Sequence, residues 1–75
     1  MTSTEPEPVD VPIREQTIRL GQLLKLAGLA ESGGHARELV QDGEVRVNGE
    51  VDLRRGRQLR RGDLVTVDDE TVRVA

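Results

Sequence analysis

The sequence predicts an α+β domain in which two N-terminal helices pack on a small, mostly antiparallel sheet. Apolar residues first recur at helical spacing, in residues 20–27 and again in residues 32–42. Valines then alternate with polar residues across residues 45–74, between short turn-forming segments. A helical period followed by a strand period in so short a chain is typical of α+β folds, in which helices cover one face of the sheet.

Length and composition allow one small domain and exclude several classes of function. A chain of 75 residues has too small a core to enclose a deep catalytic cleft. Without cysteine and with a single histidine, it offers neither a disulfide framework nor the ligands of a thiolate metal site. No apolar run approaches the roughly 20 residues of a membrane span, and the start of the chain is unlike a signal peptide. We therefore expect a cytoplasmic protein with no metal, no cofactor, no membrane contact and no small-molecule substrate.

The chain also contains no Phe, Trp or Tyr. Proteins that bind single-stranded nucleic acid usually stack bases on aromatic rings, each worth about 1–3 kcal/mol. RNA-recognition motifs and cold-shock barrels are therefore excluded, and any nucleic acid bound by such a chain would have to be recognised by its folded shape.

The first twelve residues combine three prolines with acids and hydroxyl residues. Such a segment cannot bury enough apolar surface to offset the entropy of ordering. We expect a disordered acidic tail over residues 1–12 and a folded domain over residues 13–75, with weak strand character from Ile13 to Ile18. A plain solubilising tail is favoured over a tail that shields a basic surface of the same chain.

The first helix is predicted to begin at residue 20. Its apolar stripe follows the spacing i, i+3, i+4, i+7, at Leu20, Leu23, Leu24 and Ala27. Gly28 is the expected stop, because glycine readily takes the left-handed conformation just past a helix end. Arg19 lies at the entrance of this helix, and Lys25 lies off its apolar stripe.

The second helix is predicted to begin after Ser32 and to end at Gly43, because a serine hydroxyl can accept a hydrogen bond from an amide one turn on. Its apolar stripe consists of Ala36, Leu39 and Val40. Its first turn contains Gly33 and Gly34, each of which costs about 1 kcal/mol relative to alanine inside a helix.

Two interpretations of this glycine pair stay open. The amides and the dipole at a helix start favour an anion, so the pair would let a phosphate approach the backbone closely. Alternatively, a flexible connection lets the two helices pack at a sharp angle. For His35, in the same turn, the chain offers no partners for a metal site, so we expect a surface or capping role.

A hairpin is predicted around Asn48-Gly49, because a two-residue turn of this kind needs positive φ at both central positions. Its arms alternate valine with polar residues, at Val45, Val47 and Val51. Two further strands are expected in residues 64–67 and 71–74, joined by an acidic turn.

The stretch from Leu53 to Arg61 concentrates positive charge, with no acid and with five of the eleven basic residues of the chain. These five are Arg54, Arg55, Arg57, Arg60 and Arg61. The acids of the first ten residues account for the whole net charge of -3, so the rest of the chain is balanced and the arginines form a local patch. Because nothing local is expected to neutralise these arginines, binding of an external polyanion is favoured over the alternative that the run is only a solvated loop.

This pattern resembles the S-four-type RNA-binding domain, also called the alpha-L motif, first seen in the fourth protein of the small ribosomal subunit. The resemblance covers residues 18–67. It rests on Leu20-Gly21-Gln22-Leu23-Leu24-Lys25, Ala36-Arg37, Gly43-Glu44-Val45-Arg46-Val47-Asn48-Gly49 and Gly62-Asp63-Leu64-Val65. Short stand-alone bacterial members look similar at Ser32-Gly33-Gly34 and Arg54-Arg55-Gly56-Arg57.

The resemblance implies a protein that holds structured RNA, often ribosomal, against the two helices and the adjoining loop. One departure concerns the segment that opens the second helix, where many members carry a basic residue and this chain has Gly33 and Gly34. Either Arg37 and the arginine run compensate for a missing phosphate contact, or the bound RNA differs.

We therefore expect a non-catalytic protein, not an enzyme, that holds structured RNA (ribosomal or transfer RNA) through an arginine-rich loop and the two helices. The residues expected to contact RNA are Arg19, Lys25, Gly33, Gly34, His35, Arg37, Arg46, Arg54, Arg55, Arg57, Arg60 and Arg61. The alternative is a protein–protein interaction module that docks an acidic or ribosome-associated partner.

Overall fold

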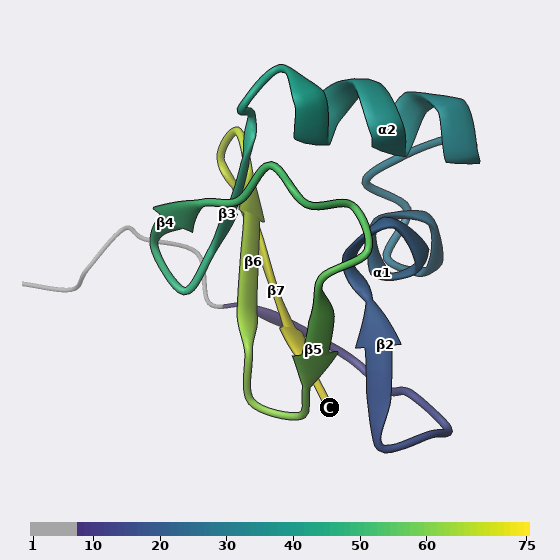
Figure 1. Ribbon diagram of the computed structural model, residues 1–75. Helices are drawn as coiled ribbons and strands as arrows, with labels where there is room; N and C mark the ends of the chain where they lie inside the picture. Colours follow the sequence, from purple (N-terminus) through teal and green to yellow (C-terminus); the bar gives the residue numbers. More distant parts are fainter. Residues whose placement is uncertain (1–7) are drawn as a thin grey trace, which may run out of the picture.

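The computed structural model describes residues 8–75, which contain two helices and seven strands (Figure 1). The helices are α1 (Leu20–Leu26) and α2 (Gly33–Gln41). The strands are β1 (Val9–Val11), β2 (Thr17–Arg19), β3 (Val45–Val47), β4 (Glu50–Val51), β5 (Gln58–Arg60), β6 (Leu64–Val67) and β7 (Glu70–Val74).

The strands form one main sheet and one small one. The main sheet has the order β1-β7-β6-β3-β4, and every neighbouring pair in it except β1 and β7 is antiparallel. The second sheet pairs β2 with β5, also antiparallel. The predicted α+β class with a mostly antiparallel sheet is therefore confirmed. Two strands precede the helices, however, so the helices are not the first elements of the chain as expected.

The expected tail boundary at residue 12 is wrong for the segment Val9–Val11. This segment is β1, which pairs in parallel with β7 at the edge of the main sheet and buries Val11. The alternation of valine and aspartate in Val9–Val11 suits a strand with one inner face. Residues 1–7 lie outside the described part of the chain, so the expected disorder there stays a prediction.

Both helices have the predicted start and stop signals. In α1 all three leucines of the apolar stripe are buried, and Gly28 follows the helix end with φ 76°. In α2 the hydroxyl oxygen of Ser32 accepts a hydrogen bond from the His35 amide at 3.1 Å. Gly43 ends that helix with φ 74°. Gly28 therefore marks the end of α1, and Gly43 marks the end of α2.

The predicted hairpin joins β3 to β4, with φ 52° at Asn48 and φ 87° at Gly49. The Asn48 side chain also ties the turn to β6, because its amide oxygen accepts from the Leu64 backbone N–H at 2.9 Å. Val51 is exposed, since it pairs with Arg46 on the outer face of the sheet.

Replacing Gly49 with valine should lower the melting temperature by several degrees. A side chain at positive φ costs about 1–2 kcal/mol, and more when it is β-branched, and about 1 kcal/mol corresponds to roughly 4–8 °C in a domain of this size. Gly56→Val is the matched control, because no atom lies within 4 Å of a Cβ built there and its φ is not in the positive range. Equal melting temperatures for the two variants would contradict the strained turn.

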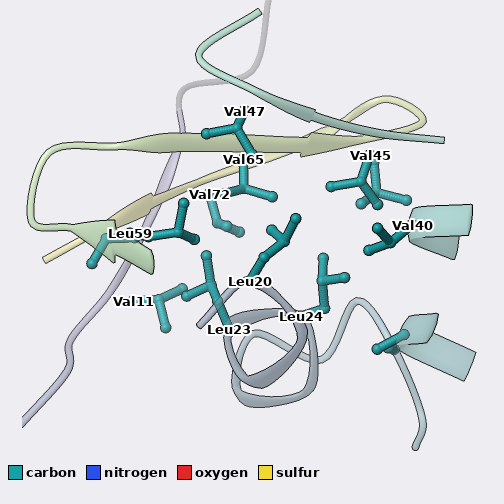
Figure 2. Close-up of a cluster of buried hydrophobic side chains, with 14 residues drawn as sticks. Val11, Leu20, Leu23, Leu24, Val40, Val45, Val47, Leu59, Val65 and Val72 are labelled. Atoms are coloured by element: carbon teal, nitrogen blue, oxygen red, sulfur yellow. The ribbon is translucent and has the colours of Figure 1, made fainter. Parts of the chain in front are cut away.

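The core lies between the helices and one face of the sheet (Figure 2). Its members from α1 and α2 meet inward-facing residues of the strands, and those labelled in the figure are Val11, Leu20, Leu23, Leu24, Val40, Val45, Val47, Leu59, Val65 and Val72. Because side chains alternate along a strand, the residues between these valines lie on the opposite, solvent-facing side. The sheet therefore divides the surface into a helix side and an outer face.

Candidate nucleic-acid interface

The arginine run is a loop only in its first half. Residues 52–57 form an irregular segment between β4 and β5, and Gln58–Arg60 then form β5 (Figure 1). β5 pairs with β2, which places Gln58 opposite Arg19, and it buries Leu59. The prediction of a single loop from Leu53 to Arg61 is therefore wrong for this strand, whose one apolar residue gave no period to detect.

A buried carboxylate, Asp52, holds the loop together. Asp52 is 5 % exposed. One of its oxygens accepts from the Arg54 amide at 2.8 Å and from Arg54 Nε at 3.2 Å. Its other oxygen accepts from an Arg54 guanidinium nitrogen at 3.1 Å and from Arg57 at 2.8 Å. Hydrogen bonds from the Arg54 and Arg57 side chains, together with the Arg54 amide, hold the pKa of Asp52 well below its ordinary value despite its burial.

The expectation that nothing local neutralises the run is therefore wrong. Asp52 stands directly before the stretch in which acids were counted, two residues from Arg54 and five from Arg57. The Arg57 side chain is 31 % exposed and the Arg54 side chain 74 %. Arg57 thus acts mainly as a structural partner of Asp52, while Arg54 still presents much of its surface to solvent.

The loop also packs directly on the start of α1. The amide of Leu20 donates to the Arg57 carbonyl at 2.8 Å, and the amide of Gly21 donates to the Arg55 carbonyl at 3.0 Å. A Cβ on Gly21 would lie 2.7 Å from Cγ of Arg55, so only glycine leaves room for the arginine stem. Gly21 was not expected to belong to the site, although the close approach of a side chain to a helix is a common reason for a buried glycine.

This packing creates a groove of about 240 Å³, which we call the basic groove. It is lined by Arg19, Gly21, Gln22, Lys25, Arg55 and Gly56. Its three cations are exposed, and none of them forms an ion pair within residues 8–75. The structure therefore brings together residues from β2, α1 and the loop, with no acid among the lining residues.

Other predicted site residues lie apart from this groove. Arg46 lies between the buried Val45 and Val47, so it belongs to the outer face of the sheet, opposite to the helices. Arg61 donates to the carbonyl of Ile13 at 2.9 Å and is thereby tied to the segment before β2. Arg60 is exposed on β5.

The first turn of α2 has its own local order. The His35 ring accepts a hydrogen bond at Nδ1 from the Glu31 amide at 3.1 Å, which is the expected capping role. A Cβ on Gly33 would meet no atom within 4 Å, and one on Gly34 would meet only the Ser32 hydroxyl, at 3.8 Å. Close helix packing therefore does not require the glycines, and a phosphate contact there stays a prediction, as it does for the exposed Arg37.

Neither a cluster of metal ligands nor a membrane-spanning helix is found in the described residues. No group of three or more His, Asp or Glu side chains in residues 8–75 is arranged to hold a metal ion. In the same range, neither helix is long and apolar enough to cross a membrane.

Comparison with known proteins identifies related sequences. The chain is 47% identical over 58 residues to the probable ribosome maturation protein RlbA of Bacillus subtilis, covering 77% of this chain and 82% of that protein. It is 35% identical over 57 residues to the putative RNA-binding protein YbcJ of Escherichia coli, covering 76% and 81%. It also matches the small ribosomal subunit protein uS4m of Schizosaccharomyces pombe at 43% identity over 67 residues, but spans only 20% of that protein.

A solved structure shares the fold. The ribosomal protein S4e of Thermoplasma acidophilum superposes with a TM-score of 0.61 over 80% of this chain and 32% of that chain, at 19% identity. The family model described as S4 domain matches residues 11–75, which includes both helices and nearly every strand. The chain therefore belongs to the S4 domain family.

Proposed function

We propose that this protein binds structured RNA without catalysing a reaction, and that the basic groove is its principal phosphate site. The observation that carries the proposal is the convergence of Arg19, Lys25 and Arg55 around one hollow with no acid in its lining. Phosphate contacts of this kind dominate the affinity of proteins for nucleic acids. Two relatives, one named as a probable ribosome maturation protein and one as a putative RNA-binding protein, support the same function.

The geometry favours recognition of a folded backbone over recognition of bases. The groove presents guanidinium and ammonium groups, which bind phosphate oxygens, and Arg55 is fixed at its stem by Gly21. The chain has no aromatic ring on which an unstacked base could lie. Ribosomal RNA is the proposed class of ligand, because the relatives include a small ribosomal subunit protein and a probable ribosome maturation protein.

The protein should bind a folded RNA helix with a bulge or loop more tightly than an unstructured strand of equal length. Shape and phosphate spacing are fixed in the folded RNA, whereas the strand has to be ordered on binding. Competition titrations with the two RNAs at one salt concentration measure the preference. Equal affinities would contradict recognition by shape.

Crosslinking in cells followed by sequencing of the attached RNA identifies the ligand. The proposal expects enrichment of one helix of ribosomal RNA, reduced when Lys25 and Arg55 are both replaced with glutamine. Recovery of proteins without RNA would instead support an interaction module for acidic partners.

A further inference from the structure

A second groove lies between the β1–β7 edge of the sheet and the end of α1. It has a volume of about 400 Å³ and is lined by Val9, Val11, Ala27, Leu29, Asp69, Glu70, Thr71 and Val72. Five of these residues are apolar, while the charged ones are both acids. We call it the acidic groove, and it shares no residue with the basic groove.

The acidic groove continues into a neighbouring hollow of about 350 Å³. The two have Leu29, Asp69 and Glu70 in common, and the second adds Gly28, Val67 and Asp68. Together they form a trough, which follows the connection after α1 and the turn between β6 and β7. Peptides in extended or helical conformation dock in surface grooves of this kind.

The apolar part of the trough is open to solvent. Val9 is 63 % exposed, and it belongs to β1, the terminal strand of the main sheet. No other strand in residues 8–75 pairs with the free edge of β1. Val9 lines the groove together with the half-buried Ala27 and Leu29, so the three form an apolar patch and not a single exposed side chain.

The charged part of the trough consists of three consecutive acids, Asp68, Asp69 and Glu70, which form no ion pair within residues 8–75. The nearest paired cation on these strands, Arg73, is bound to Asp10 at 3.2 Å. The local potential is therefore negative, which repels a phosphate backbone and attracts lysine and arginine.

We propose that the acidic groove docks a basic amphipathic peptide segment of another protein. Apolar side chains of the peptide pack on Val9, Ala27 and Leu29, and its cations lie against the three acids. Charge complementarity selects this occupant over RNA, and the apolar lining beside the acids selects it over a purely electrostatic partner. The protein would then hold RNA at one site and a basic protein at the other, and the second site stands whether or not the first binds RNA.

The test is a titration of the full isotope-labelled chain with a short peptide of alternating lysine and valine, followed by NMR. A peptide with glutamate in place of lysine serves as the comparison. The lysine peptide should shift amide signals of β1, residues 27–29 and residues 67–72, and the glutamate peptide should not. Shifts confined to other elements would overturn the proposal.

Two double variants distinguish peptide binding at the acidic groove from nonspecific electrostatic attraction. Reversing Asp69 and Glu70 to lysine should weaken peptide binding at least about tenfold, which corresponds to about 1.4 kcal/mol. The control reverses two exposed acids of the α2 region, Glu38 and Glu44, and should leave the affinity within about twofold. Equal losses in both pairs would show unspecific attraction and overturn the proposal.

Two further readouts keep the other occupants distinct. Val9→Ser, at an exposed position that leaves the core intact, should weaken the peptide several-fold, and an unchanged affinity would overturn the apolar half of the site. A dimer mass in light scattering, with the trough signals shifted before peptide is added, would assign the surface to a second copy of this chain instead.

Discussion

Replacing Lys25 and Arg55 together with glutamine should weaken RNA binding roughly 30-fold at ~0.1 M salt. Each phosphate contact contributes about -0.7 to -0.9 to the slope of log affinity against log salt, so two contacts contribute roughly -1.4 to -1.8. At ~0.1 M salt, loss of that contribution lowers the affinity by roughly 25- to 60-fold relative to a 1 M reference. Both side chains are exposed, and neither forms an ion pair in residues 8–75, so the fold should remain intact. Binding titrations at several salt concentrations measure the affinity and the slope together.

The matched control removes two cations from the outer face of the sheet, Arg46 and Arg73. Arg46 belongs to the set expected from the sequence to contact RNA, but the structure places it opposite to the basic groove. The control should keep both the affinity and the slope of the parent. If the two double variants lost affinity equally, net charge would decide binding and the groove would have no special role.

Replacing Asp52 with asparagine should lower the melting temperature at neutral pH by about 5–15 °C. The change removes the charge that accepts hydrogen bonds from Arg54 and Arg57. The amide oxygen of asparagine still accepts a hydrogen bond, and the pair with the exposed Arg54 is screened by solvent, so the net loss is about 1–2 kcal/mol. About 1 kcal/mol corresponds to roughly 4–8 °C in a domain of this size. Asp42→Asn, an exposed position at the end of α2, is the control and should melt like the parent.

The pH dependence of thermal stability is a second, independent test of the role of the Asp52 charge. The pKa of Asp52 is lowered in the folded protein from an ordinary value of 3.8. Its stabilisation is therefore fully present above that value and is lost as the pH falls further toward the folded pKa. The difference in melting temperature between parent and Asp52→Asn should stay constant from neutral pH to about pH 5 and shrink below about pH 4. A difference that stayed constant to pH 2 would show that the charge of Asp52 does not stabilise the loop.

Asp52 also changes which arginines can serve as a clean test of RNA binding. Because Arg54, Arg55 and Arg57 belong to one arginine run, a test designed from the sequence alone would remove all three together and expect little effect on stability. In the structure that change would leave the buried carboxylate without its two guanidinium partners, which is strongly destabilising for a buried charge. A loss of binding in that variant would mix loss of contact with loss of fold, which the Lys25 and Arg55 pair avoids.

Local signals in the sequence predicted the local structure well. Gly28 and the Asn48-Gly49 pair have the positive φ expected of them, and Gly43 ends its helix as expected. Ser32 likewise caps the helix that begins one residue later. These features depend on a few adjacent residues, so no knowledge of the rest of the chain is needed to predict them.

The features that were missed depend on distant partners. β1 is stabilised by β7, more than 60 residues away, and β5 by β2, about 40 residues away. Three-residue strands carry too short a period to be detected alone. Asp52 was missed because its burial depends on the loop closing over it.

The outer position of Arg46 could have been predicted, because the alternation of Val45 and Val47 already implies that the residue between them faces away from the core. The basic groove could not have been predicted in the same way. It depends on the contact between Gly21 and the stem of Arg55, which joins α1 to a loop more than 30 residues later.

The parallel pairing of β1 with β7 determines how the domain resists a mechanical load. Val9 lies beside Val72 and Val11 beside Val74, and the hydrogen bonds continue through Ala75, whose amide donates to the Val11 carbonyl at 2.9 Å. A force applied through residues 8 and 75 pulls these two strands lengthwise in opposite directions, so their hydrogen bonds are loaded in shear and have to break together. An antiparallel pair pulled at its open end would instead unzip one bond at a time. Under tension the rate of unfolding should therefore depend on the short β1–β7 ladder, although β1 contributes little more than Val11 to the core.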